Sequence, residues 1–235
     1  MPYTDLYIYI ILIAAAVWSY SSGKLTLAGA ATGALTGFII FKGAGPAGFI
    51  MLTFFFTVGS AATKWQREKK AEMNASDREK GRRTAAQVIA NSGVAVILSL
   101  LNLKQPHISI FPFIIAGSFA AATADTLSSE LGTVYGKRFY NILTLKTDKR
   151  GSDGVVSVEG TFIGIAGALV IALIHALSYG WNILILWIVI AGFVGNLADS
   201  VLGATLERKG LMGNNVVNFL NTAVGAIVCR LLLLI

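Results

Sequence analysis

The chain has 235 residues, of which 55% are hydrophobic and only 13% are charged, whereas an ordinary soluble domain has about 25% charged residues. This composition excludes a water-soluble globular protein and predicts a single integral membrane domain over residues 1–235. The net charge of +7 does not indicate binding to nucleic acid, because the basic residues concentrate in short loops, where membrane orientation and anionic lipid explain them.

The apolar runs predict an all-α polytopic membrane protein. A spanning helix needs roughly 20 mainly apolar residues, and the chain holds about eight candidate runs. The first two are short or rich in glycine, so seven spans or a re-entrant segment is the alternative. In chain order the predicted spans are Leu6–Tyr20, Leu25–Phe41, Pro46–Thr63, Ala85–Leu103, Ile110–Leu127, Thr161–Tyr179, Asn182–Ala204 and Val216–Ile235.

The loops between these spans indicate an orientation. The loop at about 64–84 is rich in Lys and Arg, which the positive-inside rule places in the cytoplasm. Counting spans outward then places Lys24 and the loops at about 128–160 and 205–215 on the same side. We therefore expect an integral protein of a prokaryotic cytoplasmic membrane, with both termini outside and its polar site facing the cytoplasm.

Two aspartates lie at corresponding positions near the cytoplasmic ends of two spans. "AAATADTLSSELG" surrounds Asp125 and "GNLADSVLGATLE" surrounds Asp199, which indicates a weak internal repeat. An ionisable group at membrane depth costs roughly 2.5–3.5 kcal/mol on insertion scales, so each is a functional candidate. Because Mg²⁺ in nucleotide sites is commonly held by one or two carboxylates and phosphate oxygens, the pair is a candidate metal site. The alternative is that each aspartate only hydrogen-bonds a neighbouring helix.

A second polar group opens the fourth span, in "GRRTAAQVIAN". Arg83, Gln87 and Asn91 follow one another at steps of four, which would place them on one face of a helix. Arginine suits a bidentate contact with phosphate. A basic anchor at the membrane interface with two polar contacts between helices is the alternative.

Two further segments are rich in groups that bind anions. The first segment, "LKTDKRGSDGVVSVEG", combines glycines, hydroxyls and cations, and glycine-rich turns expose backbone N–H groups that can bind phosphate. The Walker spacing is absent from this segment, and an ordinary surface turn is the alternative. In "GNNVVNFLNT", Asn214, Asn218 and Asn221 share a helical face and can bind a ligand or another helix. All these groups gather on the predicted cytoplasmic side, which favours one site.

The same motifs in the same order closely resemble a known family. They are "RRTAAQVIANSG" (Arg82–Gly93), "ATADTLSSELG" (Ala122–Gly132), "GSDGVVSVEGT" (Gly151–Thr161), "LADSVLGATLE" (Leu197–Glu207) and "NNVVNFL" (Asn214–Leu220). Over about residues 5 to 235 the chain resembles the phytyl-phosphate kinase family, catalogued as domain of unknown function ninety-two. The resemblance implies a membrane-embedded kinase that converts an isoprenyl monophosphate to the diphosphate with CTP or another nucleoside triphosphate. A wider likeness to dolichol and phytol kinases and to CDP-diacylglycerol synthases implies CTP and Mg²⁺.

The resemblance also transfers onto particular residues. The family's acidic motifs fall on Asp125, Glu130 and Asp199, and its glycine-rich loop falls on 151–155. Ser152 replaces the usual threonine of that loop, and Val155 replaces its second glycine. Asn214-Asn215 stands where the family has an asparagine followed by an acid.

Together these observations predict a site with three sets of residues. Asp125, Asp199 and Arg83 are the predicted catalytic residues, and Asp125, Glu130 and Asp199 are the predicted Mg²⁺ ligands. The predicted residues for binding nucleotide and lipid phosphate are Arg82, Gln87, Asn91, Ser128, Lys146, Gly151, Ser152, Asp153, Gly154, Ser157, Asn214 and Asn218. The prenyl tail would lie between glycine-rich helices and enter sideways from the bilayer.

Three other functions are compatible with these residues. A cytidylyltransferase of the CDP-lipid type would use the same metal and CTP but release pyrophosphate. A small-solute transporter would explain the many spans and the apparent repeat. A non-catalytic membrane scaffold would bind no nucleotide.

Overall fold

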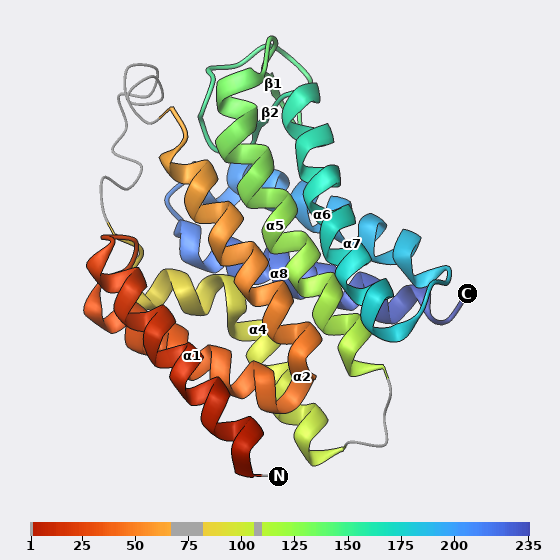
Figure 1. The fold of residues 1–235 in the computed structure, drawn as a ribbon. Helices are drawn as coiled ribbons and strands as arrows, with labels where there is room; N and C mark the ends of the chain where they lie inside the picture. The colour runs from red at the N-terminus through yellow and green to blue at the C-terminus, as the bar shows by residue number, and fades with distance from the viewer. Residues whose placement is uncertain (1, 67–81, 106–109) are drawn as a thin grey trace.

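The computed structural model describes residues 2–66, 82–105 and 110–235, and it is mostly helical (Figure 1). Six helices in these ranges are long and apolar enough to cross a membrane, which confirms an all-α polytopic membrane protein. The number of eight spans stays a prediction. The helices are α1 (Pro2–Ser21), α2 (Leu27–Lys64), α4 (Ala85–Lys104), α5 (Phe111–Tyr135), α6 (Val158–Tyr179), α7 (Leu184–Leu202), the π-helix η1 (Gly203–Glu207) and α8 (Asn214–Leu232).

Helix α2 is broken at Gly45, between the two spans predicted in this region. Gly45 has φ +65° and ψ −165°, and Pro46 follows it. A Cβ on Gly37 would lie only 3.5 Å from the ring of Phe49, whereas a straight helix would separate these residues by about 18 Å. The two halves of α2 therefore fold back against each other.

Helix α5 is the centre of the bundle. Its apolar window is 78% buried, whereas the other candidate spans are between 28% and 44% buried. Small residues allow its neighbours to approach closely: a Cβ on Gly225 of α8 would lie 2.6 Å from the Cβ of Ala121. The central position of α5 brings Asp125 next to several helices.

The prediction that residues 128–160 form a loop is partly wrong. Helix α5 continues to Tyr135 and α6 begins at Val158, so both helices extend beyond their apolar runs. The polar residues of these extensions ended the predicted spans, but polarity does not end a helix that has partners to pack on. Between the helices, strands β1 (Tyr140–Asn141) and β2 (Val155–Val156) pair antiparallel.

The described parts of the predicted cytoplasmic loops lie together at one end of the bundle, which we call the polar end. Leu25 forms a parallel bridge with Arg83, and the indole Nε1 of Trp65 donates to the hydroxyl of Tyr135 at 2.8 Å. Figure 1 shows the loop with β1 and β2 above the ends of α5 and α6. Because α1 ends here and α8 begins here, both chain termini lie toward the opposite end. Which side of the membrane the polar end faces stays a prediction.

Candidate functional site

Asp125 and Asp199 lie at the same level of two neighbouring helices. A Cβ on Gly195 of α7 would overlap the Cβ of Ala121 on α5, so the two backbones are in contact there. Asp125 and Asp199 follow these two residues by four positions, on the same helical faces and nearer the polar end. This register places both residues beside the seam between α5 and α7, and both are only partly buried.

Asp199 receives a hydrogen bond from a third helix. The side-chain Nδ2 of Asn221, on α8, donates to Oδ2 of Asp199 at 3.3 Å, and Asn221 is fully buried. The Oδ1 of Asn221 is buried without a hydrogen-bond partner among the described residues. A buried amide oxygen without a partner is unusual and indicates a position where a water or a ligand completes the site.

The chemistry of the side chains at this seam, two carboxylates, is of the kind that a magnesium–nucleotide complex uses. Within the described residues, no three His, Cys, Asp or Glu side chains come together as metal ligands. Glu130 follows Asp125 by five positions on α5, which places it on a different face of the helix. Mg²⁺ commonly keeps one or two carboxylates and takes phosphate and water oxygens otherwise, so two carboxylates can be enough, and Asp125 and Asp199 as Mg²⁺ ligands stay a prediction.

Arg83 contacts α2 and lies near α5. Its Nη2 lies 3.3 Å from Oγ1 of Thr63 and 3.2 Å from the position of a Cβ on Gly59, which also faces the methyl group of Thr126. Thr126 is the neighbour of Asp125 in the chain. The guanidinium is therefore held close to the α5 segment that carries the carboxylate.

The predicted stripe of Arg83, Gln87 and Asn91 is shorter than expected, because the helix begins after Arg83. Thr84 is the N-cap of α4, and its N–H donates to Oε1 of Gln87 at 2.7 Å while its hydroxyl accepts from the Gln87 N–H. Gln87 thus completes a capping box. Asn91 is buried, and its Oδ1 has no hydrogen-bond partner among the described residues.

The predicted phosphate loop is docked against the end of α7. Gly154 has φ +69°, and a Cβ on it would lie 2.6 Å from Cα of Ala204 in η1. Ser157 is the buried N-cap of α6 and accepts from the Gly160 N–H at 3.1 Å. Val155 belongs to β2 and does not need a positive φ, so the replacement of the family's glycine is compatible with this backbone.

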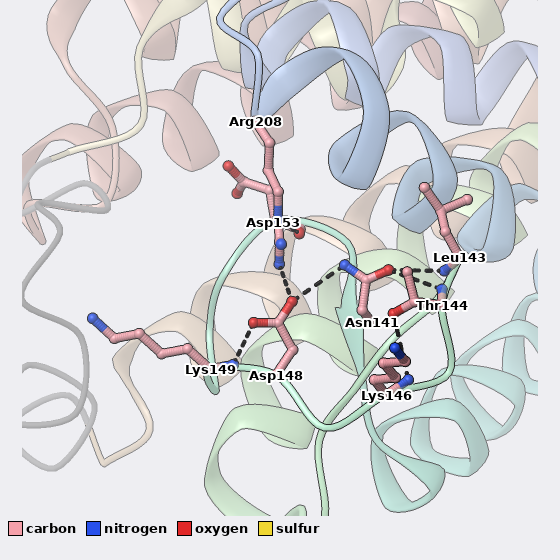
Figure 2. A network of polar contacts seen from close by, with 8 residues as sticks. All are labelled: Asn141, Leu143, Thr144, Lys146, Asp148, Lys149, Asp153 and Arg208. Carbon is pink, nitrogen blue, oxygen red and sulfur yellow. Dashed lines mark hydrogen bonds and ion pairs between the residues drawn. The ribbon is translucent and has the colours of Figure 1, made fainter.

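An ion pair fastens this loop to the segment after η1, as Figure 2 shows. Nη2 of Arg208 lies 2.8 Å from Oδ2 of Asp148, and Nε of Arg208 donates to the carbonyl oxygen of Asp153 at 2.6 Å. The side chain of Asn141 donates to the same Asp148 carboxylate at 3.2 Å. The Lys149 backbone N–H, then Arg208 and Asn141, lower the pKa of Asp148 by hydrogen bonding to its charged form.

The remaining predicted residues lie at the polar end, in different surroundings. Ser128 packs toward α6, with its Cβ 3.2 Å from the position of a Cβ on Gly164. Asn218 donates to Oδ1 of Asn214 at 3.2 Å on the first turns of α8. Lys146 is exposed, Gly151 has φ +74°, and Ser152 accepts from the Val155 N–H in a turn. The structure thus gathers these residues at one end, and their ligand roles stay predictions.

Sequence reasoning missed several of these contacts. The pattern Thr-x-x-Gln at 84–87 is a visible capping-box signal. By contrast, nothing in the spacing of Asp148 and Arg208, which lie 60 positions apart, indicates that they pair.

The fold and the site define a polytopic all-α membrane protein with a polar site at one end of its bundle. The integral membrane protein family DUF92 matches residues 10–226, and this chain belongs to that family. The resemblance stated above is therefore confirmed at the level of the family.

Several curated proteins are similar to the chain. The chloroplastic protein VTE6 of Arabidopsis thaliana is 31% identical over 216 residues, which cover 88% of this chain and 65%, slightly under two thirds, of VTE6. An uncharacterised membrane protein of Methanocaldococcus jannaschii is 34% identical over 194 residues, covering 83% of this chain and 79% of that protein. One from Synechocystis sp. is 33% identical over 197 residues, covering 81% and 75%. No solved structure matches the chain.

Proposed function

We propose that this protein is a membrane-embedded kinase that phosphorylates an isoprenyl monophosphate to the diphosphate, with CTP or another nucleoside triphosphate and Mg²⁺. The observation that carries the proposal is the pair Asp125 and Asp199, aligned on α5 and α7 at the polar end, with Asn221 bonded to Asp199. The chain belongs to the DUF92 family, and this membership supports phosphorylation of an isoprenyl monophosphate as the reaction. The position of these groups at one end of the bundle favours an enzyme over a transporter, whose site is expected near the midplane.

The proposed chemistry requires mainly positioning and neutralisation of charge. An oxygen of the lipid phosphate attacks the terminal phosphorus of the nucleotide, and the bond from that phosphorus to the bridging oxygen breaks, which releases the nucleoside diphosphate. Asp125 and Asp199 would hold Mg²⁺, which neutralises charge on the transferring phosphate when bound. Arg83 would contact phosphate oxygens beside Asp125. The acceptor is already an anion, so it needs no strong general base.

Charge removal at the two aspartates tests the proposal. Asp125→Asn and Asp199→Asn keep the side-chain shape and remove the negative charge, so we expect activity to fall by about 10²–10³-fold, as for loss of one electrostatic contact to a transition state. The matched control is Glu159→Gln, at the start of α6. Oε2 of Glu159 accepts a long hydrogen bond from the Lys137 N–H at 3.4 Å. Purified aspartate variants that keep full activity and Mg²⁺ dependence would refute the site.

A further inference from the structure

Cations from three separate segments meet where α1 ends. Nζ of Lys24 lies 3.5 Å from the ring centre of Trp18, and the guanidinium of Arg82 lies 5.2 Å from the ring centre of Tyr20. Burial and repulsion from Lys64, at the end of α2, lower the pKa of Lys24. Positive charge is therefore concentrated on one side of the polar end.

The backbone fixes this group of cations. The N–H of Arg83 donates to the carbonyl oxygen of Lys24 at 2.9 Å, and the N–H of Thr26 donates to the carbonyl oxygen of Arg83 at 3.0 Å. Lys24 and Arg82 are thus held side by side by main-chain pairing and do not depend on flexible side chains for their proximity.

An exposed apolar surface begins next to these cations. One face of α1 borders an open hollow of about 590 Å³, which ends at Ser21, shortly before Lys24. The side chains on this face are largely exposed, including Ile13 at 64% and Val17 at 61%. The residues that line the hollow are Ile10, Ile13, Ala14, Val17, Trp18 and Ser21.

A cationic group at the end of an apolar surface suits a lipid that carries a phosphate. The cations would contact the phosphate, and the chain would lie along α1 in the hydrocarbon region. Arg82 directly precedes Arg83, whose guanidinium lies beside Thr126 and hence close to Asp125. By contrast, Lys146 and Lys149 extend from an exposed polar loop, which suits a water-soluble nucleotide.

We propose that Lys24, Lys64 and Arg82 form the docking site for the phosphate of the lipid acceptor, with its chain along the exposed face of α1. The assignment of this lipid as the acceptor rests on the proposed function. The lipid would reach this site along α1, and the nucleotide would approach from the side of the loop with Lys146 and Lys149.

Binding without nucleotide tests this docking site separately from catalysis. Geranylgeranyl monophosphate is added to the purified protein and the bound lipid is measured by native mass spectrometry. In the triple variant Lys24→Gln, Lys64→Gln and Arg82→Gln, we expect binding about 100-fold weaker, which is about 3 kcal/mol at ~1 kcal/mol for each cation near a membrane surface. Geranylgeraniol, which lacks the phosphate, should bind equally to both proteins.

The matched control removes the same charge from the opposite end. Lys42→Gln, Lys104→Gln and Arg230→Gln should leave binding unchanged, although Lys42 also lies near an aromatic ring, 5.9 Å from the centre of Phe38. Thermal unfolding of both triple variants establishes that they are folded. A variant with Lys24→Arg beside Lys64→Gln and Arg82→Gln should bind roughly 5-fold more tightly than the first triple variant, because one of the three cations is returned.

The outcomes separate this inference from the proposed function. If the monophosphate binds equally to the first triple variant and to the unmodified protein, the docking site is wrong even if the protein is a kinase. If phosphatidylglycerol displaces the monophosphate at equal concentration, the site is a general one for anionic lipid and the acceptor assignment is overturned. If the phosphate-dependent loss is seen but no phosphate is transferred, the lipid-phosphate site stands and the kinase proposal fails.

Discussion

Replacing Gly154 by alanine should release the loop of residues 146–157 from η1. The positive φ of Gly154 costs an alanine about 1–2 kcal/mol, and its Cβ would lie 2.6 Å from Cα of Ala204. The overpacking of this new Cβ against Ala204 costs about 1–3 kcal/mol more. Gly210 supplies the matched control, because it has the same φ of +69° but no atom within 4 Å of its Cβ position.

The packing contribution alone predicts that the loop opens at least about 5- to 150-fold more often in Gly154→Ala than in Gly210→Ala. Limited trypsin digestion measures this opening, with cleavage after Lys146 and Lys149 followed by mass spectrometry. Kinase activity should fall in the same variant if the loop contributes to the nucleotide site. Equal cleavage rates at these lysines in both variants would show that the loop does not depend on its contact with η1.

Other substitutions probe the contacts around the site. The pKa of Asp148 is lowered, so its pairing with Arg208 stabilises the loop at pH values above 3.8, the ordinary pKa of aspartate, and this stabilisation is lost as the pH falls through the lowered pKa. Hydrogen exchange of the loop amides should show this loss of protection, and Asp148→Asn should abolish the pH dependence. Asn221→Leu should leave the melting temperature nearly unchanged, because loss of a hydrogen bond to a charge, about 1.5–3 kcal/mol, is offset by removal of an unpaired buried acceptor, about 1–3 kcal/mol. Activity should nevertheless fall at least tenfold, which is roughly the free energy of one such hydrogen bond. A large loss of stability would contradict this expectation. Gln87→Ala should destabilise the start of α4 by about 0.5–2 kcal/mol, which a lower melting temperature would show, and it should not raise the KM for nucleotide. An increase in that KM would mean that Gln87 binds the nucleotide.

The spans and the common end of the polar groups were predictable from sequence for simple reasons. Apolar runs of sufficient length must become helices in a bilayer, because every backbone polar group has to be paired within the helix. Alternation of spans then fixes that Asp125 and Asp199 lie at the same end, because the chain between them crosses twice, through α6 and through nearly all of α7. The glycine and proline at 45–46 mark the break in α2 that the two predicted spans required.

The side-chain partners were not predictable in the same way. Helix α5 is apolar around nearly its whole circumference, so periodicity does not indicate which face meets α7 and which meets α2. That Asn221 bonds Asp199 depends on this rotation. The pairing of Arg208 with Asp148 depends on how η1 ends, and a π-helix carries no sequence signal of its own.

Mass analysis of the products tests the central claim most directly. The purified protein is incubated with Mg²⁺, CTP or another nucleoside triphosphate, and geranylgeranyl monophosphate. The proposal predicts geranylgeranyl diphosphate and an equal amount of the nucleoside diphosphate. Release of pyrophosphate with a cytidylylated lipid would contradict it and identify a cytidylyltransferase, and an unchanged lipid with every nucleotide would contradict an enzyme of either kind.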